Sequence, residues 1–598
     1  MTAPRKTSLP GSLTHPVALT LVALTLGGCG GPDAAPADLV LVGGSVYSLD
    51  WSPPGPEGTP AADAPFSAAT GWRPDASAVA VAGNEILFVG DDAGVRRHIG
   101  PDTRVIDLGG AVVLPGLVDS HTHVAELGRN LSRVDLLGVD TEEEAIARVR
   151  ARAAQVPEGS WIVGAGWDEG AWADRYPDWD ALNATVPDHP VWLRGLHGFA
   201  GWGNRRAFLE AGVTEETEDP VGGEIGRTET GRLTGLLLNQ ATNLVEGAIP
   251  GPTAEERETE LLTALAEMAR SGYVAVHEAG TSASTMAALE RLDAAGRLPL
   301  RFYVMLSGRD PALLAEWIDR GPSTREGDSD PHLFVRSVKA YYDGSLGARG
   351  ARMLEDYADR PGYRGVSGAD YGFNQDSVAA MLQAGFQVAI HAIGDAGNRE
   401  SLDFLARVYS AVPQARDARN RIEHAQVVHP DDFERFVQLD VVASMEPHHA
   451  VEDMPWAEDR VGPERILGAY AWRTLLRLGV PLTFNSDNPG SDHSPFYGLH
   501  SAITRRTPTL EPPGGWYPQQ AVTPEEAVRA YTTGAAYASH LEGRTGVLEP
   551  GRWADVTVMD VDPFQVGSGE TPEAILRGRV LLTVVGGEVV YEAEGLDG

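Results

Sequence analysis

Residues 112–123 of the chain read VVLPGLVDSHTH, an apolar run that ends in a pair of histidines. The run at 112–118 predicts a buried strand, because parallel strands that are covered on both faces are apolar along their whole length. His121 and His123 are two residues apart, so on a strand their side chains point to the same side. Imidazole nitrogens suit divalent zinc and its neighbours. The stretch therefore predicts a strand that carries two metal ligands at its C-terminal end.

Seven further apolar runs follow along the chain, and most of them alternate with helix-like segments. From the second run onward they are spaced by roughly twenty to fifty residues, which is typical of βα units. The eight runs predict an α/β fold with a TIM-like (β/α)8 barrel over residues 112–545. The predicted strands are residues 112–118, 274–277, 302–305, 334–341, 387–391, 421–424, 441–445 and 482–487.

Ionisable residues gather at the C-terminal ends of these runs. Active sites of barrel enzymes form at that rim. Burying so many ionisable groups together costs free energy. A metal ion that binds these groups offsets that cost. We therefore predict a metal site built from several strand ends. Its candidate residues are His121, His123, His277, Lys339, His391, His424 and Asp487.

Single members of this set have simpler interpretations. His391 and His424 could each be a hydrogen-bonded core histidine. Lys339 could form an ion pair with Asp343. His277 could do no more than form a hydrogen bond to residues at the rim of the barrel. The combination of these residues in strand order is what favours the metal site.

Two residues of the set predict the chemistry. Asp487 is suited to be the general base for water that a metal activates. Lys339 is unusual, because a free ammonium group repels metal ions. A lysine that carbon dioxide has carboxylated becomes instead an anionic oxygen ligand, which can bridge two ions. We expect one or two divalent ions per subunit, with zinc preferred.

Short strand patterns with glycine turns flank the barrel on both sides, at residues 38–111 and 546–598. Neither piece could complete a sheet alone, so we expect one small composite β-sandwich domain made from both chain ends. Residues from about 125 to 270 separate the first two strands and are too long for a loop. They predict an inserted α/β subdomain. We interpret it as a lid over the metal site, although its tryptophans could equally form its own core.

The N-terminus is typical of a bacterial lipoprotein signal. A positive start precedes an apolar run at 16–26, which is too short to span a membrane as a mature helix. Residues 26–29 (LGGC) resemble a lipobox. We predict a signal peptide at 1–28, a lipid on Cys29 and a tether at 29–37. This places the protein in the cell envelope, anchored by lipid alone to a membrane outside the cytoplasm. A plain secretory signal is the alternative.

Cys29 is the only cysteine of the chain. A disulfide within the chain and a cysteine metal ligand are therefore excluded. The formal net charge of −36 makes nucleic acid and anionic membrane surfaces poor partners.

Several stretches together resemble the amidohydrolase superfamily. Residues 113–123 resemble its signature opening. Others are similar to amidohydrolase family 3, the group that includes the N-substituted formamide deformylases. These are GWDE at 166–169, VK at 338–339, DGSLGAR at 343–349, HAIGD at 391–395, RIEH at 421–424, SD at 486–487 and GVLEPGRWAD at 546–555.

The resemblance implies roles for individual residues. The implied metal ligands are His121, His123, His391 and His424, with Asp487 as ligand and proton shuttle and Lys339 as a carboxylated bridge. Apart from the resemblance, the lid interpretation predicts that Trp167, Asp168 and His197 face the substrate. His197 and Arg194 would orient a carbonyl or carboxylate group, Arg349 is a candidate to hold an anionic group, and His277 is a further candidate substrate contact. The chain departs from the family pattern at Asn485, where a small residue is usual, and at Leu196.

The predicted function is metal-dependent hydrolysis of a carbon–nitrogen bond, other than a peptide bond, in an amide-like small molecule. A cyclic amide, an imine or an ester is an alternative substrate class. A non-catalytic surface-binding lipoprotein is disfavoured because no ligand position is missing. A periplasmic solute-binding lipoprotein would have no reason to place histidines on successive strand ends. A homodimer is left open.

Overall fold

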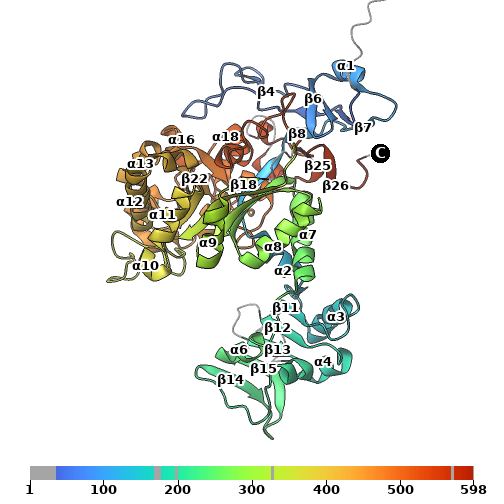
Figure 1. Ribbon diagram of the computed structural model, residues 1–598, viewed down its shortest axis with the longest axis vertical. Helices are drawn as coiled ribbons and strands as arrows, with labels where there is room; N and C mark the ends of the chain where they lie inside the picture. Colours follow the sequence, from blue (N-terminus) through green and yellow to red (C-terminus); the bar gives the residue numbers. More distant parts are fainter. Residues whose placement is uncertain (1–35, 168–176, 196–199, 325–328, 567–570, 597–598) are drawn as a thin grey trace, which may run out of the picture.

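The computed structural model describes residues 36–167, 177–195, 200–324, 329–566 and 571–596. The predicted signal and lipid site at Cys29, together with Asp168 and His197, lie outside these ranges. The described chain forms three parts, with two β-sheets at the top of Figure 1, a barrel in the middle and an inserted subdomain below. Within the described ranges no helix is both long and apolar enough to cross a membrane.

The central part is a barrel of eight parallel strands, as the sequence predicted. Neighbouring strands pair in the order β9, β16, β17, β19, β20, β21, β22, β23. Their side chains are buried almost throughout, because helices cover the outer face. The strands are β9 (Leu117–Thr122), β16 (Tyr273–Thr281), β17 (Arg301–Ser307), β19 (Leu333–Tyr341), β20 (Gln387–Ala392), β21 (Arg421–His424), β22 (Val442–Met445) and β23 (Leu482–Phe484).

The barrel closes through the residues that follow its last strand. The backbone N–H of Asp487 donates to the carbonyl of His121 at 2.9 Å. The N–H of His123 donates to the carbonyl of Asn488 at 2.7 Å. These two bonds join the first and last strands at their C-terminal ends, so residues more than 360 positions apart become neighbours.

The first predicted strand needs a correction. Residues 112–118 do not form one strand but two, β8 (Val112–Pro115) and β9, which belong to different sheets. The chain turns at Gly116, where an added Cβ would lie 2.4 Å from the Val274 side chain. Only a glycine allows this close approach of β9 to β16. The apolar run therefore extends from the composite domain into the barrel.

Helices follow the strands around the barrel. The helix before the second strand is α7 (Ala254–Arg270), and a capping box of Thr253 with Glu256 fixes its start. The other surrounding helices are α2 (Val124–Leu131), α8 (Ala283–Ala294), α9 (Pro311–Arg320), α11 (Gln375–Gln383), α12 (Asp395–Ala411), α13 (Phe433–Gln438), α14 (Pro447–Asp453), α16 (Trp472–Arg477), α17 (Pro495–Thr504), α18 (Pro524–Tyr531) and α19 (Thr533–Ala538).

Both chain ends build the composite β-domain. One sheet holds β6 (Glu85–Gly90), β5 (Ala78–Ala82), β1 (Leu39–Val42) and β7 (Arg104–Asp107). The other pairs β2 (Ser45–Val46) and β8 with β24 (Val556–Met559), β25 (Val580–Val585) and β26 (Glu588–Glu592). Apolar side chains of both sheets share one core, as in a sandwich. The predicted fold class is thus confirmed.

A buried ion pair ties the composite domain to the barrel. Arg301 of β17 donates from Nε and Nη2 to Asp555, both at 2.9 Å, and both side chains are almost fully buried. The Arg301 guanidinium also lies over the Trp553 ring, 3.9 Å from its centre. A charge buried this deeply is tolerated because it is paired and hydrogen-bonded.

The insertion between the first two barrel strands forms a six-stranded sheet with its own helices. The strand order is β10 (Val134–Asp135), β11 (Ile162–Trp167), β12 (Val191–Gly195), β13 (Ala200–Gly203), β15 (Leu233–Asn239) and β14 (Gly223–Arg227). Its helices include α3 (Glu142–Ala153), α4 (Trp179–Thr185), α5 (Arg205–Glu210) and α6 (Asn243–Glu246). Separate apolar clusters fill the two faces of the sheet.

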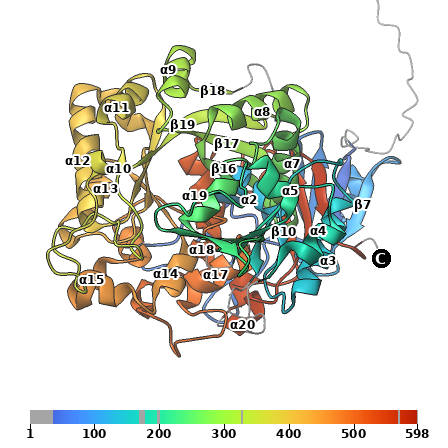
Figure 2. The ribbon, with the colours of Figure 1, turned by 90° about the horizontal axis from the view of Figure 1, so that it is seen from below.

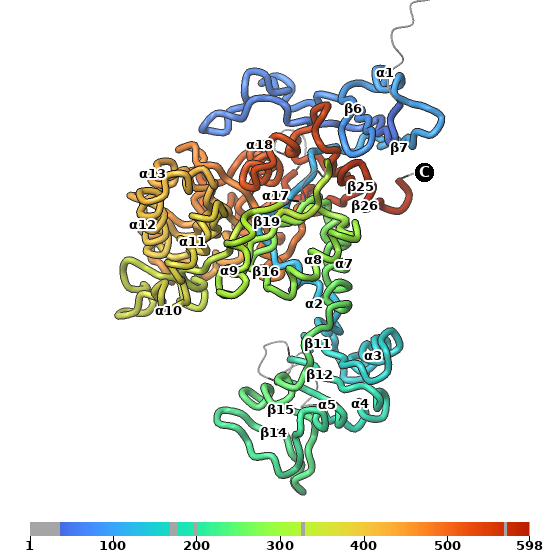
Figure 3. Tube along the Cα trace, viewed as in Figure 1, coloured from blue at the N-terminus to red at the C-terminus, as the bar shows by residue number. Residues whose placement is uncertain are grey.

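Two neighbouring helices, α2 and α7, connect this subdomain to the barrel (Figure 3). An added Cβ at Gly128 would lie 2.1 Å from the carbonyl oxygen of Glu260, so the two helices are in backbone contact. Because α2 begins directly after His123, the subdomain is attached on the side of the barrel where the strands end. Seen from below, its helices α4 and α5 lie in front of the barrel (Figure 2).

Candidate metal centre

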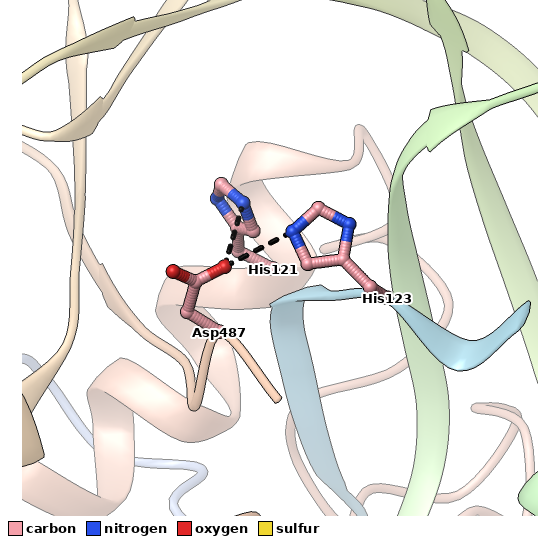
Figure 4. Close-up of side chains that lie close together, drawn as sticks. All are labelled: His121, His123 and Asp487. Atoms are coloured by element: carbon pink, nitrogen blue, oxygen red, sulfur yellow. Dashed lines mark ion pairs between the residues drawn. The ribbon is translucent and has the colours of Figure 1, made fainter. Parts of the chain in front are cut away.

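The closure of the barrel brings three predicted ligands together. His123 Nε2 lies 3.2 Å from Asp487 Oδ1, and His121 Nε2 lies 3.4 Å from the same oxygen (Figure 4). The His121 side chain is fully buried, whereas 28% of the His123 side chain is exposed. The three ligand atoms thus converge at a point that remains open on the His123 side.

Lys339 of β19 belongs to the same cluster. Its Nζ lies 2.7 Å from Nε2 of His121. The alternative ion pair with Asp343 is not formed, since that carboxylate accepts backbone N–H groups of residues 352, 393 and 394. Burial lowers the pKa of Lys339, although the nearby Glu423 opposes this effect. A lowered pKa favours the neutral amine.

His391 and His424 complete the set that the sequence predicted. Their ring centres are 4.4 Å apart, and the ring of His424 lies 5.1 Å from that of His121. The buried Nε2 of His391 has no hydrogen-bond partner among the described residues. Burial, and then the neighbouring His424, hold the pKa of His391 well below its usual value. His391 is therefore a neutral imidazole whose Nε2 lies 3.7 Å from Asp343 Oδ1, too far for a hydrogen bond.

Two of the clustered residues have a strained backbone. His424 has φ of 72° and Asp487 has φ of 51°, both in the left-handed region that non-glycine residues rarely adopt. Such conformations cost free energy and persist where the surrounding structure imposes them, which is common at functional sites.

The structure adds two residues that the sequence interpretation missed. Glu446 Oε2 lies 3.0 Å from Nδ1 of His424 and 3.4 Å from Nδ1 of His449. His449 Nε2 in turn lies 4.0 Å from Asp487 Oδ2. Burial opposes a charge on His449, but the hydrogen bond to Glu446 raises its pKa to about 10. The sequence feature that could have identified these two residues is the polar run that follows the seventh strand.

These side chains form two groups that could each hold an ion. One is His121, His123 and Asp487, and the other is His121, His424 and Glu446. The ligand atoms within each group lie within 4.8 Å of one another. His121 is common to both groups and its Nδ1 contacts Glu423, so its Nε2 can bind an ion of one group or of the other.

His277 lies beneath the cluster and not at its open side. Its Nδ1 is 3.0 Å from Nη1 of Arg421, and both side chains are buried. Burial, and then the charge of Arg421, hold the pKa of His277 well below its usual value. The structure thus places His277 in a buried contact with Arg421, and its role in binding substrate stays a prediction.

Trp167 also differs from its prediction. Its ring is fully buried in the core of the inserted subdomain, 6.5 Å from the ring of Trp202, and its Nε1 donates to the carbonyl of Leu193. It supports the subdomain and presents no exposed surface to a substrate. The neighbouring candidates Asp168 and His197 lie outside the described residues.

The two arginines predicted to hold an anionic group are both paired. Arg349 donates to Asp359, with Nη2 at 2.7 Å from Oδ2. Arg194 lies 2.7 Å from Glu246. A carboxylate of the protein thus already occupies each predicted anion site.

A model of the amidohydrolase family, family 3 of that superfamily, matches residues 104–591 of the chain. The chain is a member of this family. It is 31% identical to the protein LONG AFTER FAR-RED 3 of Arabidopsis thaliana, over 94% of this chain and 92% of that protein. It is 28% identical to an N-substituted formamide deformylase of Arthrobacter pascens, over 87% of this chain and 96% of the enzyme.

A solved structure agrees with the family assignment. The crystal structure of an uncharacterized metal-dependent hydrolase from Pyrococcus furiosus superimposes with a TM-score of 0.67 at 27% identity, covering 88% of this chain and 99% of the other. The resemblance inferred from the motifs is thereby confirmed. Family membership and the buried histidine–carboxylate cluster together make the chain a metal-dependent hydrolase of the amidohydrolase superfamily.

Proposed function

We propose that the chain uses one or two zinc ions to hydrolyse the carbon–nitrogen bond of an amide-like small molecule. The observation that supports this most is the set of imidazoles that converges on the one ionised carboxylate of Asp487. The unpartnered Nε2 of His391 and Oε1 of Glu446 are atoms that a bound ion would satisfy. The residues therefore fit a divalent metal.

The donor set suggests which metal the site prefers. Imidazole nitrogens with carboxylate oxygens suit zinc better than magnesium or calcium, which prefer oxygen ligands alone. The residues that the structure describes include no cysteine that could shift this preference. The residues that would hold the ions are His121, His123, His391, His424 and Asp487, with Glu446 beside them.

Asp487 is placed to move the proton of the reaction. Burial alone would raise the pKa of Asp487, but the neighbouring His121, His123 and His424 hold it well below its usual value. The carboxylate is thus ionised at neutral pH and can accept a proton from an attacking water. It then returns the proton to the amine nitrogen as the carbon–nitrogen bond breaks. A bound ion supplies Lewis acidity, which polarises the carbonyl group of the substrate.

Lys339 is proposed to carry a carboxylate group. Its buried amine has a lowered pKa, and the neutral form can attack carbon dioxide. The new N–C bond forms as the nitrogen loses a proton, which leaves an anionic carbamate. This anion would supply an oxygen ligand at the position where Lys339 Nζ now contacts Nε2 of His121.

An activity screen with metal analysis tests the proposed function. We expect purified protein to contain about one or two zinc ions per chain and to hydrolyse N-substituted formamides, the class named for the Arthrobacter relative. Cyclic amides, imines and esters belong in the same screen, because activity on these alone would change the substrate class. Protein that binds no metal and gains no activity when zinc is added would contradict the proposal and favour a binding role.

We also propose that the mature chain is anchored by a lipid on Cys29 and meets its substrate outside the cytoplasm. The apolar run and the lipobox-like residues 26–29 support this. Labelling with a radioactive fatty acid tests it. The expected result is a labelled, membrane-bound parent and an unlabelled, released C29S variant. Equal labelling of both would contradict the proposal.

A further inference from the structure

Arg309 lies at the rim, directly beside the strand that carries Lys339. It follows β17, and the preceding Gly308 donates its N–H to the carbonyl of Lys339 at 2.9 Å. An added Cβ at Gly308 would lie 2.6 Å from that carbonyl oxygen, so this position requires the bare backbone. The glycine therefore holds the loop against β19 and places Arg309 beside the C-terminal end of that strand.

The side chain of Arg309 rests on aromatic rings of the site. Its guanidinium carbon is 4.1 Å from the ring centre of Tyr341 and 5.2 Å from that of Tyr371. Lys339 Nζ lies 5.1 Å from the same Tyr341 ring, and the ring of His391 lies 5.8 Å from it. Lys339 and Tyr341 are two residues apart on one strand and share a face. Tyr341 thus connects Arg309 to the cluster.

The charge of Arg309 is not neutralised by the protein. Among the described residues it has no ion-pair or hydrogen-bond partner for its side chain, and it is exposed. A guanidinium over a ring uses its face, which leaves the N–H donors along its edge available. Arg349 and Arg194, in contrast, are occupied by Asp359 and Glu246.

We propose that Arg309 binds an anionic group of the substrate and so selects amides that carry a carboxylate. The planar fork of a guanidinium matches a carboxylate with two parallel hydrogen bonds. The ionised carboxylate of Asp487 near Tyr341 would repel such a substrate. A free cation held at the rim offsets that repulsion. This inference rests on the proposed function, because the anion belongs to the hydrolysed amide.

A matched pair of substrates tests the selection. N-formylglycine ends in a carboxylate, and N-formylglycinamide is its neutral counterpart. We expect R309Q to lower kcat/KM for the anion by roughly 10- to 100-fold and to leave the neutral amide within about twofold. R309K should lose part of the preference for the anionic substrate, since lysine keeps the positive charge but lacks the planar guanidinium group. R360Q is the matched control, because Arg360 also lies 4.1 Å over a tyrosine ring, that of Tyr363.

A binding measurement separates the two proposals. The metal-loaded protein and its R309Q variant are titrated calorimetrically with benzoate and with neutral benzamide. We expect R309Q to weaken only benzoate binding, and R360Q to change neither. Equal benzoate binding by R309Q and the parent, or none by the parent, would overturn the anion site. If no amide is hydrolysed but Arg309 still governs benzoate binding, the proposed function fails and the anion site stands.

Discussion

Glu423 Oε2 lies 2.5 Å from Nδ1 of His121, and both side chains are completely buried. This contact holds the His121 ring so that its Nε2 faces Asp487 and Lys339. Burial alone would raise the pKa of Glu423, but Arg421, 2.7 Å away, and His121 hold it well below its usual value. An ionised carboxylate behind a histidine fixes the tautomer and makes the other nitrogen a better ligand.

Replacing Glu423 with glutamine should weaken metal binding. The amide cannot provide the negative charge that orients His121, and loss of such an outer contact typically costs roughly 10- to 100-fold in affinity. Competition with a zinc-binding dye measures the change. E434Q, an exposed site on α13, is the control and should bind zinc like the parent. An E423Q variant with the affinity of the parent would show that Glu423 has no part in orienting the ligand.

Substitution of Asp487 should abolish most of the turnover while the metal stays bound. In D487N the four histidines remain and the amide keeps one side-chain oxygen that can face the ion, so we expect the ion content to stay close to that of the parent. The amide cannot accept a proton, so kcat should fall by roughly 100- to 10,000-fold. His391→Ala is the contrasting variant, because it removes a ligand and should lose both metal and activity. Metal analysis and single-turnover assays measure the two effects, and full activity of D487N would refute the assigned role.

Much of the site could be predicted because each ligand lies near the C-terminal end of a strand. Lys339 and His391 stand out as polar residues within apolar runs, and parallel strands bring such ends to one rim. The break at Gly116 could not be predicted, because the run is apolar in both sheets and only the closeness of Val274 reveals the turn. The position of residues 485–488 beside β9 also needed the three-dimensional structure.

Physical reasons explain why the sequence did not reveal the positions of Glu446, Arg349 and Trp167. Glu446 begins a helix directly after its strand, so its polar neighbours look like an ordinary helix start. The ion pair of Arg349 with Asp359 spans a loop, where sequence patterns do not fix which side chains meet. The core role of Trp167 depends on the packing of Trp202 from another strand.

Truncation of the Trp167 side chain should therefore lower the free energy of unfolding. W167A would open a cavity in the core of the inserted subdomain and should cost roughly 3–5 kcal/mol of its unfolding free energy. W167F keeps most of the packing but loses the hydrogen bond to Leu193, so it should cost less. Denaturant unfolding followed by tryptophan fluorescence measures both. A W167F variant of parental stability with a strongly raised KM would instead place the ring in the substrate pocket.

Acid should weaken a contact that supports the loop after Asp487. Glu267 of α7 lies 3.3 Å from Nε2 of His493, whose Nδ1 is 3.2 Å from Nδ2 of Asn488. The hydrogen bond from His493, aided by Arg270, lowers the pKa of Glu267 to about 2 from 4.5. A lowered carboxyl pKa stabilises the folded state above pH 4.5, and this contribution is lost as the pH falls toward 2.

E267Q should be less stable than the parent above pH 4.5, with a gap that narrows steadily toward pH 2 because the parent carboxyl then becomes protonated as well. Denaturant unfolding across this range gives the two curves. The size of the gap depends on solvent screening, since the pair is partly exposed. If the difference in unfolding free energy between the two proteins stays constant with pH, the ionisation of Glu267 does not contribute to stability. If that difference widens in acid, the ionised carboxylate destabilises the folded state.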